Sequence, residues 1–206
     1  LETQTHGLPY PIFVYAGLLP WTFFASSMST AGNSVVGSQN LITKVYFPRL
    51  IIPLSAVGAG LVDFALAFVI LIGMMLWYGI YPGIGLVLLP LLLLFIALAA
   101  LAVGTILSAL TVAYRDFRYV VPFLAQIWMY VTPVIYPASI VPERWQWVLA
   151  LNPMGGLIEG FRYSLLGQPE NWTPHSMLIS MAVTVVGFLA GVFYFRRLER
   201  HFADIV

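Results

Sequence analysis

The chain has 206 residues, of which 61% are hydrophobic and only 8% charged, with 9 Lys and Arg against 8 Asp and Glu. A soluble domain is about 25% charged, so this chain has too few charges to cover a water-facing surface, and we predict a membrane protein. The absence of Cys excludes disulfides, thiol nucleophiles and thiolate metal sites. A net charge of +1 also argues against nucleic-acid binding.

The gaps between charged residues outline the membrane spans. No charge lies between Glu2 and Lys44, or between Asp63 and Arg115. The second gap is more than twice the length of about 20 residues that one span needs, and the Gly and Pro residues of segment 78–83 divide it. We therefore predict an all-α integral membrane protein, a polytopic helical bundle with five spans near residues 11–31, 50–78, 84–112, 119–136 and 176–195.

The Lys and Arg residues predict how these spans are oriented. Seven of the 9 flank the same side of the predicted membrane: Lys44, Arg49, Arg115, Arg118, Arg196, Arg197 and Arg200. That side is expected to be cytoplasmic, and so is the C-terminus. Five spans then put Leu1 outside without a signal peptide. We therefore expect an upstream span and a cytoplasmic N-terminal segment beyond the given sequence, and treat residues 1–206 as one transmembrane domain.

Residues 33–49 are too polar for a span and mix apolar side chains with Ser, Asn, Gln and Lys. This pattern favours a short helix on the cytoplasmic membrane surface, or a plain loop with interfacial anchors. The aromatic pair Tyr46 and Phe47 and the rigid Pro48, between Lys44 and Arg49, favours a docking element.

Residues 138–175 are too long for a tight turn. Asn152 and Pro153 predict a helix start and Gly167 its end. Its roughly 14 residues cover about 21 Å, less than the membrane core of about 30 Å. The preceding piece carries Trp145 and Trp147. Two readings stay open: a hairpin on the outer surface, or a re-entrant pair that gates an exit, with Trp145, Trp147, Glu159 and Arg162 as its candidate residues.

Asp63 is the only acid inside a predicted span, where an ionisable group is costly. It follows Ser55 and Ala59 and precedes Ala67, a row of small residues that lets another helix approach. Asp63 is therefore expected to form a polar contact between helices, and a proton or substrate role is the alternative.

Aromatic residues recur along one face of the fourth predicted span, at Tyr119, Phe123, Gln126 and Tyr130. Such a stripe serves packing or lines a path for a sugar, since Tyr and Gln facing lipid would lack polar partners. Trp21 and Phe24 of the first span are added to this candidate path. Pro122 and Pro133 are expected to bend the fourth span.

No phosphate-binding loop, HExxH motif or catalytic triad is present, and we assign no catalytic residue and no metal site. Four segments in order, 40–55 (NLITKVYFPRLIIPLS), 113–118 (AYRDFR), 132–137 (TPVIYP) and 151–154 (LNPM), resemble the type-2 ABC exporter permeases for polysaccharides and polyol phosphates.

The resemblance implies six spans in full-length members, an amphipathic N-terminal helix, and two permease copies with two ATPase subunits that bind ATP and Mg. It implies a bacterial cytoplasmic (inner) membrane location and a lipid-linked substrate of O-antigen, capsule or teichoic acid type. Residues 40–49, including Lys44, Val45, Tyr46, Phe47, Pro48 and Arg49, would be the coupling helix. Arg115, Asp116 and Arg118 would form the second cytoplasmic loop, and the region after the fourth span would hold the external re-entrant helices.

Two other function classes remain open at this point. A proton-coupled carrier would use Asp63 and work without an ATPase. A membrane-embedded glycan-lipid enzyme would need a cluster of acids, whereas the acids outside the spans are scattered singly.

Overall fold

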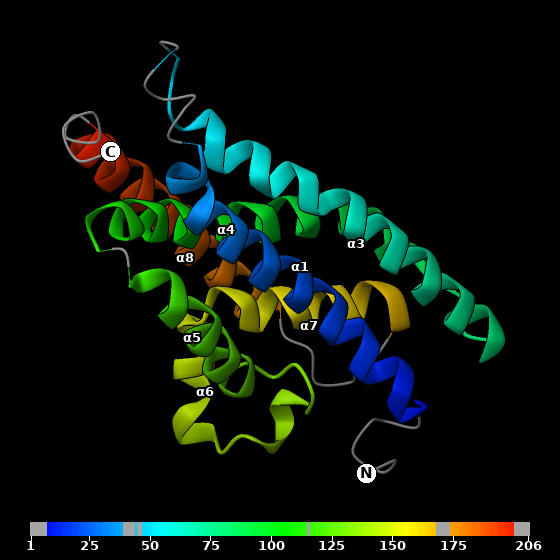
Figure 1. Cartoon of the computed structure of the whole chain (residues 1–206). Coiled ribbons are helices and arrows are strands. Elements are labelled where there is room, and N and C mark those ends of the chain that lie inside the picture. Colours follow the sequence, from blue (N-terminus) through cyan, green and yellow to red (C-terminus); the bar gives the residue numbers. More distant parts are fainter. Residues whose placement is uncertain (1–7, 39–43, 45–46, 115, 168–173, 200–206) are drawn as a thin grey trace.

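The computed structural model describes residues 8–38, 44, 47–114, 116–167 and 174–199 of the chain. Within these residues all regular secondary structure is helical, as Figure 1 shows. The predicted all-α bundle is thereby confirmed. Its elements begin with α1 (Tyr10–Gly37), α3 (Ile51–Trp77), the short η2 (Ile84–Leu88) and α4 (Leu89–Ala113). They continue with α5 (Phe117–Val131), η3 (Ala138–Ile140), α6 (Glu143–Leu151), α7 (Pro153–Leu166) and α8 (Pro174–Leu198).

The number of membrane-length helices differs from the predicted five. Among the residues that the structure describes, four helices are long and apolar enough to cross a membrane: α1, α3, η2 with α4, and α8. Helix α5 has 15 residues and so measures about 22 Å, less than the hydrocarbon thickness of about 30 Å. It ends at Val131 because the next residue, Thr132, precedes Pro133, which disfavours helical backbone at the residue before it. Pro133 therefore ends this helix, where the sequence predicted a bend.

Helix α1 is longer than predicted and includes residues 33–37 of the proposed surface segment. Its polar side chains donate to carbonyl oxygens of the preceding turn, Thr30 to Ser26 at 2.8 Å and Asn33 to Ser29 at 2.9 Å. Because the helix itself supplies these partners, hydroxyl and amide groups fit at membrane depth. Polarity alone was thus a poor guide to where the first span ends.

Helix α1 forms the centre of the bundle and packs against α4 and α3, while α8 covers another side of α4. Helix α7 crosses the middle of the bundle and contacts α1, α4 and α8 (Figure 1). Helices approach each other closely at several glycines. A Cβ on Gly104 of α4 would lie 2.7 Å from the Cβ of Ala31, and one on Gly191 of α8 would lie 2.7 Å from the Ala102 carbonyl oxygen.

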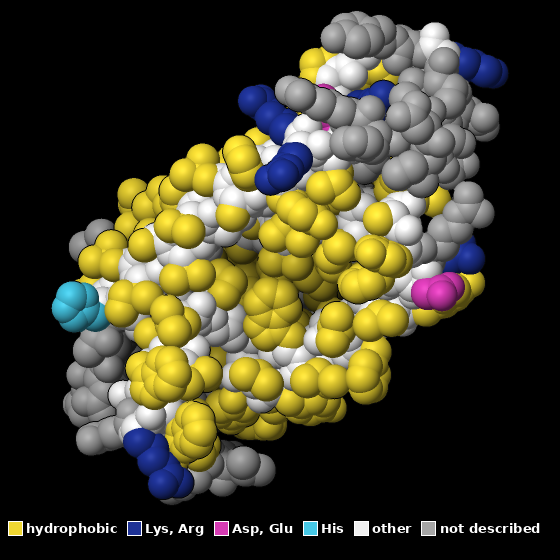
Figure 2. Space-filling view, turned by 90° about the vertical axis from the view of Figure 1, so that its left-hand side faces the viewer, with side chains coloured by type: hydrophobic (Ala, Val, Ile, Leu, Met, Phe, Trp, Pro, Cys, Tyr) yellow, Lys and Arg dark blue, Asp and Glu magenta, His cyan; other side chains and the backbone are white. Residues whose placement is uncertain are grey.

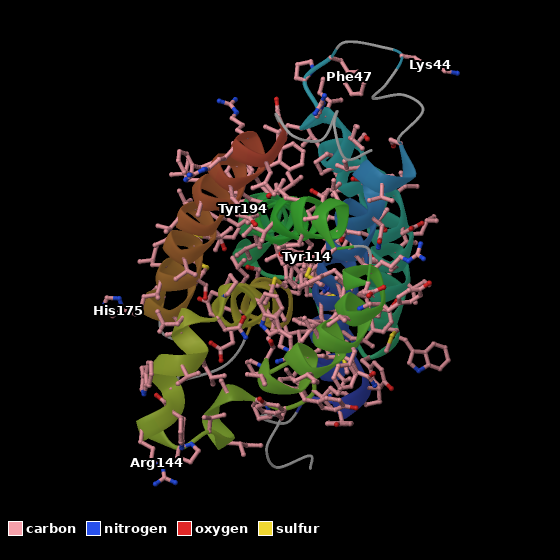
Figure 3. All side chains as sticks on the ribbon, turned by 60° about the vertical axis from the view of Figure 1, so that its left-hand side comes forward. Lys44, Phe47, Tyr114, Arg144, His175 and Tyr194 are labelled. Atoms are coloured by element: carbon pink, nitrogen blue, oxygen red, sulfur yellow. The ribbon has the colours of Figure 1, made fainter. Side chains whose placement is uncertain are left out.

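Elements far apart in sequence share the two ends of the bundle. The chain before α3 and the C-terminal end of α8 lie at one end, and α6 lies at the other (Figure 1). Figure 3 likewise places Lys44 and Phe47 opposite Arg144. At the first end the guanidinium of Arg49 donates to the backbone carbonyl of Glu199. The start of α3 is thereby joined to the end of α8.

We expect Gly104→Val to destabilise the bundle, since its side chain would collide with α1. Overpacking of this kind costs about 1–3 kcal/mol. The melting temperature of the purified protein in detergent should fall. Gly73→Val in α3 is the matched control, because no atom lies within 4 Å of a Cβ there. Equal melting temperatures for the two variants would contradict the close α1–α4 contact.

Candidate functional site

The proposed coupling segment leads directly into α3. Lys44 and Pro48 are exposed, and Phe47 and Arg49 are half-buried, while Val45 and Tyr46 fall outside the described residues. The amide of Ile51 donates to the Pro48 carbonyl at 3.0 Å, so the segment continues into the first turn of α3. Since Arg49 also holds the end of α8, a force on this segment would reach two membrane helices.

The second candidate loop joins α4 to α5. Asp116 and Arg118 are exposed there, whereas Arg115 is not among the residues described. The Arg118 guanidinium carbon lies 4.7 Å from the centroid of the Tyr119 ring, a cation–π distance. Arg118 lies in the first turn of α5, so this contact joins two neighbouring residues of that helix.

The stripe on α5 faces away from the bundle. Tyr119, Phe123 and Tyr130 are 69%, 63% and 61% exposed, and Gln126 is exposed as well. Val121 and Ala125 are the buried residues of this helix. Because α5 is helical from Phe117 to Val131, residues spaced by four, three and four lie along one side of it. No helix described here covers that face.

The face of the molecule on which Tyr114 and Tyr194 lie is largely apolar (Figures 2 and 3). Figure 2 shows mainly hydrophobic side chains around a hollow near the centre of the view, with Lys and Arg towards its margins. In Figure 3, which is turned in the same direction, Tyr114 and Tyr194 are labelled on this side, at the end of α4 and on α8.

Trp21 and Phe24 are not part of this exposed face. They are 3% and 0% exposed, and their rings lie 6.2 and 5.2 Å from the ring of Trp128, on the inner side of α5. In this chain the two residues pack α1 against α5, as the packing alternative predicted. The sequence grouped Trp21 and Phe24 with the stripe because all are aromatic. Their contact with Trp128 depends on which face of α1 meets α5, and the sequence does not show that.

The candidate gate residues divide between the outside and the interior. Trp145 and Trp147 on α6 are exposed, whereas Arg162 on α7 is buried. Burial raises the pKa of Glu159, while a hydrogen bond of 3.2 Å from the Ser176 hydroxyl and the charge of Arg162 lower it. Burial lowers the pKa of Arg162 to about 10, against the charges of Glu159 and Tyr10, so that its guanidinium stays protonated at neutral pH.

Helix α7 lies inside the bundle, and most of its residues are buried. Its predicted boundaries are confirmed. The Asn152 side chain accepts from the Met154 amide at 3.1 Å, and Gly167 ends the helix with a φ of 67°. The sequence did not reveal that Asn152 and Arg162 also reach the chain after α5. The only signal in the sequence was that Arg162 lies among the apolar residues of a short helix.

Asp63 lies on the exposed side of α3, together with Ser55 and Ala59. Its carboxylate makes no hydrogen bond or ion pair with any side chain that the structure describes. The neighbouring Ala67 faces α1, where its carbonyl accepts from the Tyr15 hydroxyl at 3.2 Å. The polar helix contact predicted for Asp63 would therefore involve a helix outside the described bundle.

Within the described ranges, no three His, Asp or Glu side chains are grouped so that they could hold a metal ion. The arrangement instead offers a partly exposed segment before α3 at one end, an exposed aromatic helix face, and a buried helix near the other end.

Comparison with known proteins identifies the class. The family model described as ABC-2 type transporter matches residues 1–166. The O-antigen export system permease protein RfbA of Myxococcus xanthus is 30% identical over 199 residues, which are 96% of this chain and 76% of that protein. A Klebsiella pneumoniae protein of the same name is 28% identical over 198 residues, with the same coverage of both chains. The inner membrane transport permease YadH of Escherichia coli K12 is 24% identical over 169 residues, 79% of this chain and 65% of that protein.

These matches confirm the resemblance to ABC exporter permeases. Permeases of this type are transport subunits that work with an ABC ATPase, and the apolar helices are consistent with a multi-pass protein of the inner membrane. With most of its length matched by the family model, the chain belongs to the ABC-2 type transporter family.

Proposed function

We propose that this chain is the permease subunit of an ATP-driven exporter that moves a lipid-linked polysaccharide or polyol-phosphate polymer across the cytoplasmic membrane. The observation that carries the proposal is the similarity to O-antigen export permeases over 96% of the chain. Two copies of the chain would work with two copies of the ATPase. ATP and Mg would bind to the ATPase, and this chain would supply the path.

The basic residues support an orientation for this assembly. Arg196 and Arg197 lie in the last turn of α8, beside the end that Arg49 contacts, and Lys44 lies at the same end of the bundle (Figure 3). Positive residues favour the cytoplasmic side. The C-terminus and the coupling segment would therefore face the ATPase, and α6 and α7 would face outwards.

The coupling segment would pass ATPase motion to the membrane helices. Phe47 and Pro48 lie one turn before α3, and the adjacent Arg49 is bonded to the end of α8. Phe47 and Pro48 would form an apolar knob that enters a groove on the ATPase. Aromatic side chains suit this role because they bury a large area for few rotatable bonds. Displacement of the knob would then shift α3 and α8 together.

The aromatic stripe of α5 would line the polymer path between two copies of the chain. A polymer longer than the protein has to slide, so its contacts need to be weak, repeated and tolerant of register. Aromatic faces meet this need by stacking on sugar rings, and Tyr and Gln add hydrogen bonds. The stripe is exposed and uncovered by the described helices, which leaves it available for such a path. Helix α7 would lie at its outer mouth.

We expect the double variant Tyr46→Ala and Phe47→Ala to uncouple the transporter. ATP hydrolysis by the assembled complex should continue while export falls strongly, since the knob would no longer transmit motion. Both activities can be measured in membrane vesicles that contain permease and ATPase.

A matched control is Trp77→Ala with Tyr81→Ala. These are two exposed aromatic residues at the opposite end of α3, and their removal should leave the ratio of export to hydrolysis unchanged. Normal export by the Tyr46 and Phe47 double variant would refute the docking role.

Cysteine labelling tests the path, because the native chain contains no Cys. Single Cys at Tyr119, Phe123, Gln126 or Tyr130 should react with a membrane-impermeant, water-soluble thiol reagent. Cys at the buried Val121 should not react.

The decisive control uses the other exposed row of α5, which is Val120, Leu124, Ile127 and Val131. These four side chains are also exposed in the single chain, but they are aliphatic, whereas the stripe is aromatic and polar. They should stay unlabelled if they face hydrocarbon. Equal labelling of both rows would show that exposure alone governs the reaction, and labelling confined to the aliphatic row would reverse the assignment of the path.

Asp63 separates the exporter from a proton-coupled carrier. We expect Asp63→Asn to keep export, because Asn retains hydrogen bonding and removes only the charge. Asp63→Leu should lower export by removing the polar contact with a second helix. Export at matched expression levels is the measurement. Complete loss in Asp63→Asn, with normal assembly, would favour the carrier.

A further inference from the structure

The chain just after α5 is non-helical but buried. Thr132, Pro133 and Val134 are all buried, although α5 ends at Val131. Backbone groups released from a helix need partners where water is excluded, since each unsatisfied group costs several kcal/mol, roughly, in hydrocarbon. The segment 132–136, here called the exit turn, is therefore stable only if its surroundings supply hydrogen bonds.

Part of this need is met within the exit turn itself. The Thr132 hydroxyl donates to the Trp128 carbonyl at 2.8 Å. The Tyr136 hydroxyl lies 3.1 Å from the Tyr130 carbonyl oxygen and 3.3 Å from that of Val131. The last turn of α5 is thus capped by side chains that follow it. The carbonyls of Pro133 and Val134 still require donors from elsewhere.

Arg162 of α7 supplies these donors. Its guanidinium donates to the Pro133 carbonyl at 2.8 Å and also to the Val134 carbonyl. A third bond of 3.2 Å reaches the Phe13 carbonyl at the start of α1, and the Phe13 ring centroid lies 3.9 Å from the guanidinium carbon. Gly17 of α1 leaves the space, because a Cβ there would lie 2.7 Å from that carbon. One buried cation thereby joins α7, α1 and the exit turn.

Asn152, at the start of α7, forms a second link to the same region. Its amide nitrogen donates to the Thr132 hydroxyl at 2.8 Å, and its side-chain oxygen accepts from the Trp128 indole at 3.1 Å. Its backbone carbonyl accepts from Ser180 of α8 at 3.0 Å. The exit turn is therefore bonded to two positions of α7 that lie ten residues apart in sequence. In Figure 1 the green ribbon that follows α5 runs beside α7.

The rest of α5 is held much less firmly. Val121 and Ala125 are its buried residues, and its remaining apolar side chains are mostly exposed. A helix fixed by several hydrogen bonds at its end and by little burial along its length can swing about the fixed end. The exit end of α5 is thus fixed by hydrogen bonds, whereas the rest of the helix has few buried side chains and can move.

We infer that Asn152 and Arg162 are positioning residues that anchor the exit end of α5 to α7 throughout the transport cycle, so that α5 moves by pivoting on the exit turn. This inference rests on the proposed export function. It assigns the two residues a mechanical role in place of contact with substrate. The joint between Thr132 and Asn152 stays closed while the cytoplasmic end of α5 moves.

A reversible cross-link tests this directly. In the Cys-free chain, Thr132→Cys with Asn152→Cys places two thiols where the native side chains touch. Oxidation joins them in a disulfide, each thiol giving up one hydrogen to the oxidant, and a reductant reopens it. The permease with its ATPase partner is assayed in vesicles for export and for ATP hydrolysis. The reduced variant should hydrolyse ATP but export several-fold less than wild type, and bridging should restore export.

Loss of export on bridging would overturn the inference, because the joint would then have to open. Wild-type export by the reduced variant would overturn it as well. The two single-Cys variants, treated with the same oxidant, control for modification. Wild type without the ATPase must not export. If wild-type complex fails to export the glycan, the proposed function fails, whereas failure of this inference appears only in the variants.

A second variant tests the hydrogen bonds between Arg162 and the exit turn without changing Arg162 itself. In Gly17→Ala, the new methyl group would collide with the guanidinium and the Val134 carbonyl. We expect the same loss of export with retained ATP hydrolysis. Gly37→Ala is the matched control, since it lies on the same helix with no atom within 4 Å of its Cβ. Normal export in Gly17→Ala would refute the anchoring by Arg162.

Discussion

The need to satisfy backbone polar groups away from water governs this structure. A continuous helix meets that need by itself, and α1, α3, α4 and α8 do so. Helix α5 stops at Val131, and the chain then turns while still buried. This turn is possible because Arg162 supplies donors to two carbonyls that no helix serves. Arg162 thereby joins α7 to α1 and to the exit turn, in addition to the apolar packing of α7 against α1, α4 and α8.

Burial of a cation is usually unfavourable, and here the geometry explains why Arg162 tolerates it. Desolvation lowers its pKa, but only to about 10. Three carbonyl oxygens and the face of Phe13 surround the guanidinium. These dipoles replace its hydration shell, and charge-assisted hydrogen bonds are stronger than neutral ones. Lys could not serve the same partners, because its ammonium group lacks the planar arrangement of donors.

Much of the fold was predictable from the sequence because apolar length and charge position are local properties. The four long helices, the cap at Asn152 and the common face of Tyr119 and Tyr130 all follow from spacing. The end of α5 was less predictable, since Pro133 can either bend or end a helix depending on its surroundings. The end of α1 was misplaced because the sequence does not show that Asn33 bonds back to Ser29.

The candidate site was predictable only where it depends on one helix. Periodicity shows which residues share a face, but it does not show what the face meets. Trp21 and the stripe residues have similar chemistry, yet Trp21 packs against Trp128 inside the bundle. The partners of Arg162 lie on α1 and after α5, so they become visible only when three segments are placed together. Interactions of this kind carry no short-range signal.

The unequal helix lengths have a consequence for the surrounding lipid. Helix α3, with 27 residues, is about 40 Å long, and α5, with 15 residues, is about 22 Å long. Both present aliphatic side chains outwards. A bilayer adapts to a long apolar helix through helix tilt or local thickening, and to a short one through local thinning. Lipids beside α5 would therefore span less hydrocarbon than those beside α3, which shortens the distance that a polar headgroup travels between leaflets at that side of the protein.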